Sequence, residues 1–286
     1  MIKLLVLGSS GMLGHKVYNY LKKNSNFILV NFSGSRKLNS ETILIDARDQ
    51  KKLIDSIELM KPDFIVNCVG ALIHNSNTNP EQAIYLNSLL PMMLERVSDR
   101  IGSKLIHIST DCVFSGNKKS PYVENDPKDG SGLYAVTKGL GELIGENSVT
   151  LRTSIVGPEL KNNGEGLFNW FMNQSGNIEG YTKMIWSGVT TLELSKAIKW
   201  TIENEIKGIY HITNNQSISK YDLLHLFNLY TNKKIEIIPV EGSDVDKSFI
   251  DTRKLINYTI PSYDEMVREM VVDMVQSKSL YKHYNL

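Results

Sequence analysis

The sequence predicts an α/β fold in which a doubly wound parallel sheet is followed by a smaller C-terminal region. Two observations predict it. Short apolar runs alternate with helical patterns through the first half of the chain, which is typical of strands and crossover helices. A glycine-rich turn directly follows the first apolar run and opens the first helical pattern. The length of 286 residues is enough to bury a large core without disulfides or metal ions.

The expected strands are short apolar runs, and the expected helices carry apolar residues at helical spacing. We expect strands at residues 2–7, 27–32, 43–46, 64–69, 104–109, 149–156 and 208–213. We expect helices at residues 12–23, 50–60, 80–100, 131–147 and 190–204. Strands that alternate with helices in this way form a parallel sheet that is covered on both faces. The polar stretch at 116–132 is rich in turn residues and predicts an active-site loop.

Charge and composition exclude several classes of function. The 32 lysines and arginines almost balance the 31 aspartates and glutamates, so no bulk charge favours nucleic acid or an anionic membrane. The two cysteines are too few for a disulfide framework or a four-cysteine zinc site, and the six histidines do not stand at metal-ligand spacing. The apolar run at 2–7 is too short for a signal peptide, and no stretch approaches the roughly 20 apolar residues of a membrane span. The sequence therefore predicts a cytoplasmic protein without a metal, nucleic acid or membrane partner.

Three glycines, Gly8, Gly11 and Gly14, stand in a G-x-x-G-x-x-G turn between the first strand and the first helix. The first allows a tight turn, the second lets the backbone approach a pyrophosphate, and the third lets the helix pack closely on the strand. The N–H groups at the start of the helix, around Met12 and Leu13, are placed to bind the phosphates. This turn predicts a dinucleotide cofactor. A glycine-rich turn in a nucleotide-free α/β protein is the alternative.

The second strand indicates which dinucleotide is bound. Its end carries Ser33 and Arg36 and no acidic residue, whereas an acid there would bind the ribose 2′-hydroxyl of NAD. An arginine suits a 2′-phosphate, so we expect NADPH, with NADH as an open alternative. The alternative is that Arg36 is an exposed loop residue without a cofactor contact, and NADPH is then not preferred over NADH. Asp46 and Ala47 follow the third strand and can meet the adenine ring, although Asp46 can equally be a helix N-cap. Three residues at the end of the fourth strand complete the expected cofactor site: Cys68, Val69 and Gly70.

A phenol and an ammonium, Tyr134 and Lys138, stand four residues apart and share one face of a predicted helix. The cation lowers the pKa of the phenol, so the tyrosine can exchange a proton with a carbonyl or alcohol oxygen. Thr110, at the end of the strand at 104–109, can hold the same oxygen. The pattern Tyr-x-x-x-Lys occurs twice more in the chain, but this copy alone follows a buried strand that ends in Ser-Thr. We therefore expect Thr110, Tyr134 and Lys138 to be the catalytic residues.

The glycine turn and the three catalytic candidates together resemble an extended short-chain dehydrogenase/reductase. Longer strings are more specific: HISTDCVFSG at 107–116, and PYVENDP at 121–127 followed by YAVTKGLGE at 134–142. They closely resemble dTDP-4-dehydrorhamnose reductases and related nucleotide-sugar 4-reductases. The resemblance extends from residue 1 to about residue 157 and is loose beyond it.

The resemblance implies a Rossmann-type sheet, NADPH, and an oxidoreductase that reduces the 4-keto group of a dTDP- or UDP-activated 6-deoxyhexulose. This reaction belongs to deoxysugar biosynthesis for cell-surface polysaccharide. The resemblance carries Thr110, Tyr134 and Lys138 over as the catalytic residues, and it gives Lys138 a second contact with the cofactor.

The resemblance also implies a division of the chain between cofactor and substrate. The expected cofactor domain is 1–157, with 190–213 returning to it, and the expected substrate-binding region is 158–189 with 214–286. The expected substrate-binding residues beside Thr110 are Asp111, Cys112, Val113 and Phe114. From their side chains alone, Trp186 can stack on a base or sugar or pack in the core, and Arg253 can clamp the diphosphate or lie on the surface. A homodimer stays open.

Two departures from the rhamnose enzymes keep alternatives open. Cys112 stands where those enzymes usually have tyrosine, and residues 181–191 look more like reductases of capsule and O-antigen clusters. In the similar GDP-fucose synthases, a cysteine near this position works with a histidine to epimerise the keto sugar. A bifunctional 3,5-epimerase/4-reductase that uses Cys112 is therefore one alternative, although no histidine stands near 154–170. A catalytically silent dinucleotide-binding regulatory subunit is the other. A dehydratase is not expected, because Asp111 is followed by cysteine and not by glutamate.

Overall fold

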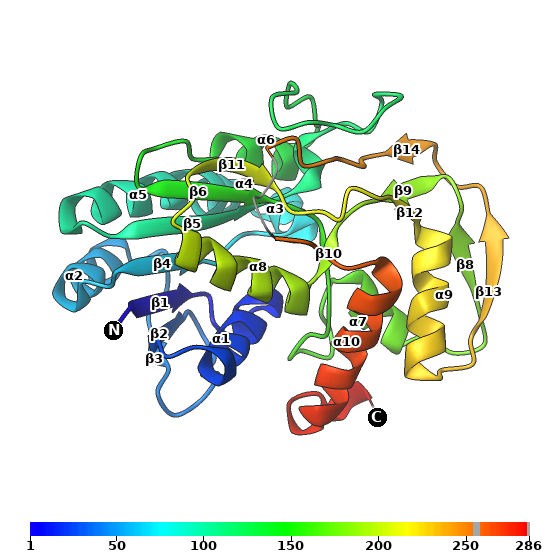
Figure 1. Ribbon diagram of the computed structural model, residues 1–286, viewed down its shortest axis with the longest axis horizontal. Helices are drawn as coiled ribbons and strands as arrows, with labels where there is room; N and C mark the ends of the chain where they lie inside the picture. The colour runs from blue at the N-terminus through cyan, green and yellow to red at the C-terminus, as the bar shows by residue number, and fades with distance from the viewer. Residues whose placement is uncertain (254–257, 285–286) are drawn as a thin grey trace. The chain divides into compact units, whose positions relative to one another are not determined.

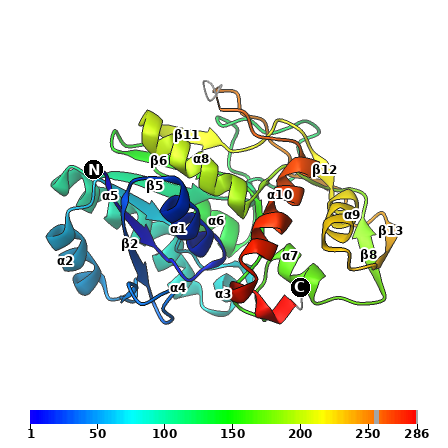
Figure 2. The same ribbon diagram turned by 60° about the horizontal axis from the view of Figure 1, so that its bottom comes forward.

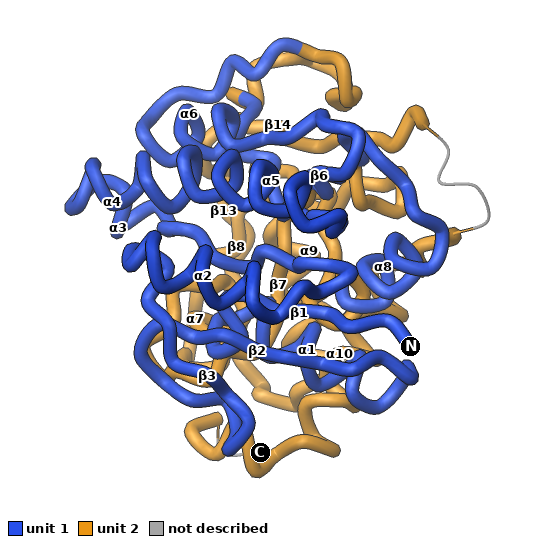
Figure 3. The backbone as a smooth tube through the Cα atoms, turned by 90° about the vertical axis from the view of Figure 1, so that its left-hand side faces the viewer, with its two compact units in different colours: residues 1–114, 127–152, 195–210 blue, residues 115–126, 153–194, 211–286 orange. Residues whose placement is uncertain are grey.

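The computed structural model of the protein describes residues 1–253 and 258–284. The chain folds into two compact units (Figure 3). The first contains residues 1–114, 127–152 and 195–210, and the second contains residues 115–126, 153–194 and 211–286. The chain therefore passes between the units more than once. These bounds are geometric, and the functional division into a cofactor domain and a substrate-binding region stays a prediction.

A seven-stranded sheet forms the centre of the first unit (Figure 1). Its strands lie in the order β11, β6, β5, β4, β1, β2, β3, and the pairs from β6 to β3 are parallel. The strands are β1 (Lys3–Leu7), β2 (Ile28–Ser33), β3 (Ile43–Leu44), β4 (Phe64–Asn67), β5 (Lys104–Ser109), β6 (Ser148–Arg152) and β11 (Gly208–His211). The order reverses between β1 and β4, and ligands of such sheets bind beyond the carboxyl ends of the strands at this point. The predicted doubly wound parallel sheet is confirmed.

Helices cover both faces of this sheet. The helices are α1 (Met12–Asn24), α2 (Gln50–Met60), α3 (Ile73–Thr78), α4 (Pro80–Ile84), α5 (Leu90–Ile101), α6 (Leu133–Leu140) and the greater part of α8 (Thr191–Asn204). Figures 2 and 3 show α1 and α8 on one face, and α2 and α5 on the other. Leu5 and Leu7 of β1 point to the second face, where they share a buried core with Leu53 of α2 and Leu94 of α5.

One predicted helix is interrupted. The expected helix at 80–100 consists of α4, a π-helical turn at Tyr85–Leu89, and α5. Pro91 has no N–H group and cannot donate to the carbonyl oxygen of Asn87, four residues earlier. The helical bonds shift register here, and the N–H of Leu90 donates five residues back along the chain.

Two other predicted elements are shorter than expected. The expected helix at 131–147 is limited to α6, and Gly141 follows at once. The backbone of Gly141 lies so close to Asn87 that a Cβ there would be 1.9 Å from the Asn87 carbonyl oxygen. The expected strand at 149–156 is divided into β6 and β7 (Ile155–Val156). Apolar runs predict both elements, but neither the close contact nor the break can be read from them.

The second unit consists of short strands and helices. Its elements include β7, α7 (Leu167–Met172), β8 (Asn177–Tyr181), β9 (Met184–Trp186), β10 (Val189–Thr190), β12 (Ile218–Ser219), α9 (Lys220–Thr231), β13 (Glu236–Val240), β14 (Val245–Asp246) and α10 (Tyr263–Gln276). β8 pairs with β13, β7 with β10, and β9 lies between β12 and β14. α9 packs on β8 and against α10. Among residues 1–253 and 258–284, no helix has the length and apolar character that a membrane span needs.

We expect Gly141→Ala to destabilise the protein by about 2 kcal/mol or more, since the added Cβ would overlap a backbone oxygen that cannot move aside. Gly139→Ala is the matched control. A Cβ at Gly139 would lie 3.5 Å from the flexible side chain of Lys128. This second alanine should therefore be neutral or stabilise α6 by up to about 1 kcal/mol. Urea unfolding of the two variants checks the expectation, and equal stabilities would contradict it.

Candidate active site

The glycine turn connects β1 to α1. Gly8 has a φ of +85°, which favours glycine, and a Cβ at Gly14 would lie 2.2 Å from the Gly8 carbonyl oxygen. Only glycine at position 14 therefore lets α1 begin this close to β1. The helix begins at Met12, after Gly11, and none of the described side chains caps it. Its first N–H groups, which include that of Leu13, can bind an anionic group such as a phosphate.

Ser10 and Ser33 bring the glycine turn and β2 together. Their hydroxyl oxygens are 2.6 Å apart, and Arg36 donates from Nη2 to the carbonyl oxygen of Ser10 at 3.4 Å. Arg36 is half-buried, whereas the neighbouring Lys37 is exposed. The Arg36 guanidinium therefore lies beside the turn, where it can meet a second phosphate.

A cavity of ≈ 210 Å³ opens at the carboxyl ends of the strands beside the glycine turn. The predicted cofactor residues that line it are Gly8, Ser33, Asp46, Ala47 and Val69. Seven further lining residues were missed from the sequence: Leu7, Gly34, Ser35, Ile45, Arg48, Gln82 and Leu86. The mixture of aliphatic walls with polar and charged groups can hold an aromatic base and its ribose.

Asp46 is paired with Arg48 at the edge of this cavity. The guanidinium donates from Nε to both carboxylate oxygens at 3.0 and 3.1 Å and from Nη2 at 2.5 Å. These bonds hold the pKa of Asp46 below its usual value. The N-cap of α2 is Asp49, which accepts from the N–H of Lys52. The N-cap alternative for Asp46 is therefore wrong.

Cys68, Val69 and Gly70 follow β4, and the first two lie next to the glycine turn. A Cβ at Gly8 would be 2.9 Å from Val69 Cγ2 and 3.1 Å from the carbonyl carbon of Cys68. The N–H of Val69 donates to Asn67 Oδ1 at 3.1 Å, which fixes this wall of the site. Burial raises the pKa of the Cys68 thiol to about 12, so this sulfur is not a thiolate nucleophile near neutral pH.

Asn87, in the π-helical turn, joins the loop after β4 to α6. Its amide accepts from the N–H of Ala71 at 2.8 Å, and donates to the Ala71 carbonyl and to the Thr137 hydroxyl, both at 3.1 Å. Ser88 Oγ donates to the Thr137 carbonyl oxygen at 2.7 Å. Thr137 directly precedes Lys138, so the π-helical turn fixes the helix that carries the predicted tyrosine and lysine. Asn87 was missed from the sequence, where its signal is the proline four residues later.

Thr110 follows β5 and caps a 3₁₀ turn formed by Asp111–Val113. Its hydroxyl oxygen accepts from the N–H of Cys112 at 3.1 Å, and its proton is donated to Asp111 Oδ1 at 3.0 Å. In the bond from Cys112 the hydroxyl is the acceptor, so this bond does not use the hydroxyl proton. A rotation of the hydroxyl away from Asp111 turns it toward another acceptor, such as a carbonyl oxygen.

Three other predicted substrate residues lie in the same turn or next to it. Cys112 is half-buried, whereas Val113 and Phe114 lie in the interior of the first unit. The guanidinium of Arg152 lies 5.0 Å from the centre of the Phe114 ring. Packing therefore accounts for Val113 and Phe114, and the substrate contacts expected of all three residues stay predictions.

Tyr134 and Lys138 lie on one face of α6, which packs against the 3₁₀ turn after Thr110. Lys138 is buried and donates from Nζ to the carbonyl oxygen of Ile108, in β5, at 2.6 Å. Burial lowers the pKa of Lys138 to about 8, against opposing effects of Glu142 and of Cys68. The ammonium is therefore still the main form at neutral pH, and it lies beside the strand that leads to Thr110.

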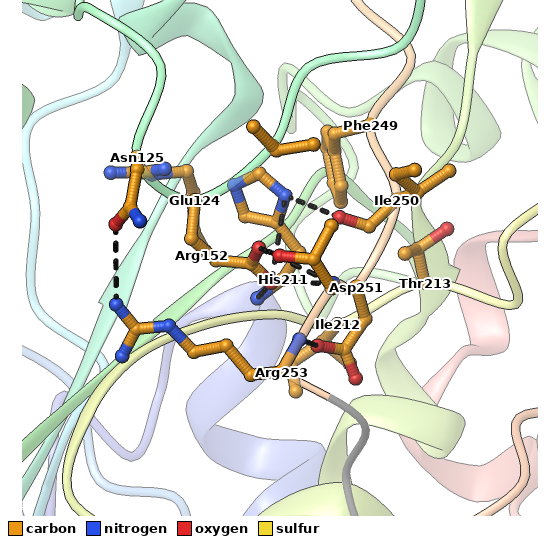
Figure 4. Close-up of polar contacts among 12 residues, drawn as sticks. Glu124, Asn125, Arg152, His211, Ile212, Thr213, Phe249, Ile250, Asp251 and Arg253 are labelled. Atoms are coloured by element: carbon orange, nitrogen blue, oxygen red, sulfur yellow. Dashed lines mark hydrogen bonds and ion pairs between the residues drawn. The ribbon is translucent and has the colours of Figure 1, made fainter.

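Trp186 and Arg253 belong to the second unit. Trp186 ends β9 and is buried, with its ring 5.7 Å from the ring of Tyr263. Arg253 is exposed, and Figure 4 shows its guanidinium directed toward Asn125, with Nη2 3.5 Å from Oδ1. Its backbone N–H donates to Asp251 Oδ1 at 3.0 Å. An exposed guanidinium can bind a diphosphate, whereas the burial of Trp186 favours a core role. Their substrate roles stay predictions.

Comparisons with known proteins identify similar chains. The sequence profile of the family described as "RmlD substrate binding domain" matches residues 2–248. The spore coat polysaccharide biosynthesis protein SpsK of Bacillus subtilis is 27% identical over 227 residues, which are 78% of this chain and 77% of that protein. Methionine adenosyltransferase 2 subunit beta of Xenopus tropicalis is 28% identical over 236 residues, which are 77% of this chain and 70% of that protein.

A solved structure shares the fold. The crystal structure of dTDP-4-dehydrorhamnose reductase from Bacillus anthracis, in complex with NADP, matches with a TM-score of 0.81. The match covers 96% of this chain and 100% of that chain at 20% sequence identity. At this identity the match concerns the fold alone.

The buried ammonium of Lys138 should make stability depend on pH. The pKa is about 8 in the folded protein and 10.5 in the unfolded chain, so between these values the unfolded chain binds the additional proton. The folded state therefore bears a penalty on the order of 3 kcal/mol below pH 8, and loses that penalty as the pH rises toward 10.5.

Lys138→Met has no ammonium at this position, so its stability relative to the wild type should fall by this amount between pH 7 and pH 10.5. Urea unfolding at several pH values measures the difference. Lys37→Met, at an exposed position, is the control and should show little change. A difference between wild type and Lys138→Met that stays constant with pH would contradict the burial of a charged lysine.

Proposed function

Because the chain belongs to the family described as "RmlD substrate binding domain", we propose that it is an NADPH-dependent reductase of a nucleotide-activated 4-keto-6-deoxyhexulose. The family resemblance drawn from the sequence motifs is confirmed by this membership. The observation that carries the proposal is the position of Lys138, whose buried ammonium is bonded to β5, beside Thr110 and on the same helix face as Tyr134. A structural helix gains nothing from such a buried charge, whereas a proton-donating tyrosine needs one nearby.

The residues of the first unit fit the dinucleotide. Gly14 packs closely against the Gly8 carbonyl, so α1 begins close to β1. The first N–H groups of α1, which no described side chain caps, can hold a pyrophosphate. Arg36 lies beside this turn and would hold a 2′-phosphate, while the cavity with Ala47 and Asp46 would take the adenine side. The Bacillus anthracis protein of the same fold binds NADP, which supports the same choice here.

When bound in the first unit, NADPH would supply the hydride that reduces the C4 carbonyl carbon. Tyr134 donates its phenolic proton to the carbonyl oxygen, so the product is an alcohol. The Lys138 ammonium stabilises the phenolate that remains, until a proton from solvent restores the phenol. The Thr110 hydroxyl donates a hydrogen bond to the same oxygen and stabilises the negative charge that develops there.

The polysaccharide relative SpsK supports a role in deoxysugar biosynthesis for a surface polysaccharide. The nucleotide, dTDP or UDP, is set by contacts in the second unit, where Arg253 is the proposed ligand of the diphosphate. We place the reaction in the cytoplasm on the basis of the sequence, and a homodimer remains an open part of the proposal.

The purified protein should oxidise NADPH when it is given a dTDP- or UDP-linked 4-keto-6-deoxyhexose. Tyr134→Phe removes the proton donor and should lower kcat by about 100- to 10,000-fold. Tyr230→Phe is the matched control, since Tyr230 begins another Tyr-x-x-x-Lys pattern and its hydroxyl is bonded to Asp264 instead. Its kcat should stay close to that of the wild type. The change in NADPH absorbance measures both rates, and a Tyr134→Phe enzyme as fast as the wild type would disprove the proposed role.

Arg36→Ala should weaken NADPH binding about tenfold and leave NADH binding unchanged, because the charged hydrogen bonds to the 2′-phosphate are lost. Fluorescence titration with each cofactor measures the two dissociation constants. Lys37→Ala, next in the chain and exposed, should alter neither. Arg48→Ala tests the other guanidinium at the cavity. If Arg48→Ala and not Arg36→Ala affects NADPH selectively, Arg48 is the phosphate ligand and the assignment to Arg36 is wrong.

A regulatory subunit is a second candidate function. It is favoured by the similarity to methionine adenosyltransferase 2 subunit beta, which is by its name a subunit of another enzyme. Tight NADPH binding without turnover of any 4-keto sugar would support this candidate over the reductase. Turnover that depends on Tyr134 would exclude it as the main function.

A further inference from the structure

A buried ion pair lies in the first unit, close to the predicted catalytic residues. Arg152, at the end of β6, donates from Nε to Glu142 Oε1 at 2.8 Å and from Nη2 to Glu142 Oε2 at 2.7 Å. Both side chains are 1% exposed. Burial acts to raise the pKa of Glu142, but the bonds from Arg152 and Ser109 outweigh it, and the pKa lies below its usual value. The carboxylate is therefore ionised at neutral pH.

The same carboxylate connects several chain segments. Ser109 Oγ, at the end of β5, donates to Glu142 Oε1 at 2.6 Å. Lys128 Nζ lies 3.3 Å from Glu142 Oε2 and also donates to the carbonyl oxygen of Gly139, in α6. Glu142 thus binds the last residue of β5, the last residue of β6 and the loop before α6. Ser109 directly precedes Thr110, and Glu142 stands four residues after Lys138.

Stability alone gives a weak reason for this arrangement. The free-energy cost of removing two charges from water offsets much of their mutual attraction. A protein with well-packed apolar side chains of similar volume at these positions is often as stable. What the bidentate pair supplies is geometry, because the planar guanidinium fixes both oxygens of the carboxylate at once.

We propose that Glu142 is a positioning residue, whose carboxylate, fixed by Arg152, holds the end of β5 at Ser109 against α6 and so aligns Thr110 with Tyr134 and Lys138. The proposal rests on the reductase function proposed above. Glu142 itself touches neither cofactor nor substrate in this scheme. It acts through Ser109 and through its electrostatic effect on Lys138.

The electrostatic effect has a definite direction. Burial lowers the pKa of Lys138, and the negative charge of Glu142 is the larger of two effects that raise it again, the other being Cys68. His107 also faces Lys138, but burial and Lys138 itself hold the pKa of His107 well below its usual value, so it is neutral. Arg152 and Lys128 face Glu142, and Asp111, Cys112 and Tyr134 are further ionisable groups of the adjoining 3₁₀ turn and of α6. Loss of the Glu142 charge should therefore favour a neutral Lys138.

The test is Glu142→Gln, which keeps the size of the side chain and removes its charge. We expect kcat to fall about 10- to 100-fold with little change in KM, because the reacting groups lose their alignment. We also expect the alkaline limb of the pH profile of kcat to move to lower pH. Glu95→Gln is the matched control: Glu95 also binds a serine hydroxyl of the first unit, that of Ser148, and should leave both quantities unchanged.

A second measurement does not need turnover. Carbon-13 labelling of lysine side chains allows the titration of Lys138 to be followed by NMR, with the signal assigned by its loss in Lys138→Arg. The pKa of Lys138 should be lower in Glu142→Gln than in the wild type. If Glu142→Gln leaves Arg152 as an uncompensated charge and does not fold, Glu142→Gln/Arg152→Met removes both charges and should show the same loss in kcat and the same shift.

The outcomes separate the two proposals. A wild-type protein that turns over no 4-keto sugar disproves the reductase, and the NMR titration then decides alone whether Glu142 controls Lys138. An active wild type, with Glu142→Gln equal to Glu95→Gln in kcat, pH profile and Lys138 titration, overturns the positioning role. A lower melting temperature with unchanged kcat also overturns it, because Glu142 is then a structural residue alone.

Discussion

The contact between Asn87 and the end of α6 fixes several separate segments of the first unit to one another. Pro91 cannot donate to the Asn87 carbonyl, the helix widens into a π-helical turn, and the Gly141 backbone comes to lie against that carbonyl. The Asn87 side chain meanwhile binds both backbone groups of Ala71 and the hydroxyl of Thr137. Asn87 thereby fixes both the loop after β4, beside the glycine turn, and α6, which carries the proposed proton donor. The proposed cofactor site and the proposed catalytic helix are therefore held by the same residue.

The buried ionisable groups of the first unit are also held in place by specific partners. Buried polar groups are stable only when they are paired, and the interior here contains both neutral and charged ones. His107 is kept neutral by burial and by Lys138, and its Nδ1 lies 3.2 Å from the Asn67 amide nitrogen. Glu142 and Arg152 are charged and bonded to each other at two points. The Lys138 ammonium donates to the neutral backbone carbonyl of Ile108 in β5, and the role we propose for its charge is to stabilise the phenolate of Tyr134. Buried ionisable groups whose pKa values are shifted from their usual values concentrate at functional sites.

Much of the first unit could be predicted because its signals are local. The glycine turn, the strand that ends at Thr110 and the helix with Tyr134 and Lys138 are each read from fewer than about 15 consecutive residues, which is the range over which hydrophobic periodicity and turn chemistry act. The α2 helix and β5 were predicted with the bounds that the structure shows.

The features that were missed depend on residues far apart in the chain. The helix expected at 131–147 is short because Gly141 meets Asn87, and no pattern within 131–147 contains that information. Glu142 looks like an ordinary acidic residue after a helix until Arg152 and Ser109 are seen around it. Long-range pairs of this kind are set by the tertiary fold and leave no periodicity to read.

The dependence on Pro91 also has an evolutionary consequence. An ordinary amino acid at position 91 would restore an N–H group for the Asn87 carbonyl and draw that oxygen back into a regular α-helix. The requirement for glycine at position 141 would then relax, whereas a larger residue at 141 is compatible only with a helix that has lost its bulge. Positions 91 and 141 should therefore change together among related chains. A chimaera that takes the helix at 80–101 from one relative should take 133–141 from the same parent, because the Asn87 carbonyl and the Gly141 backbone must fit each other.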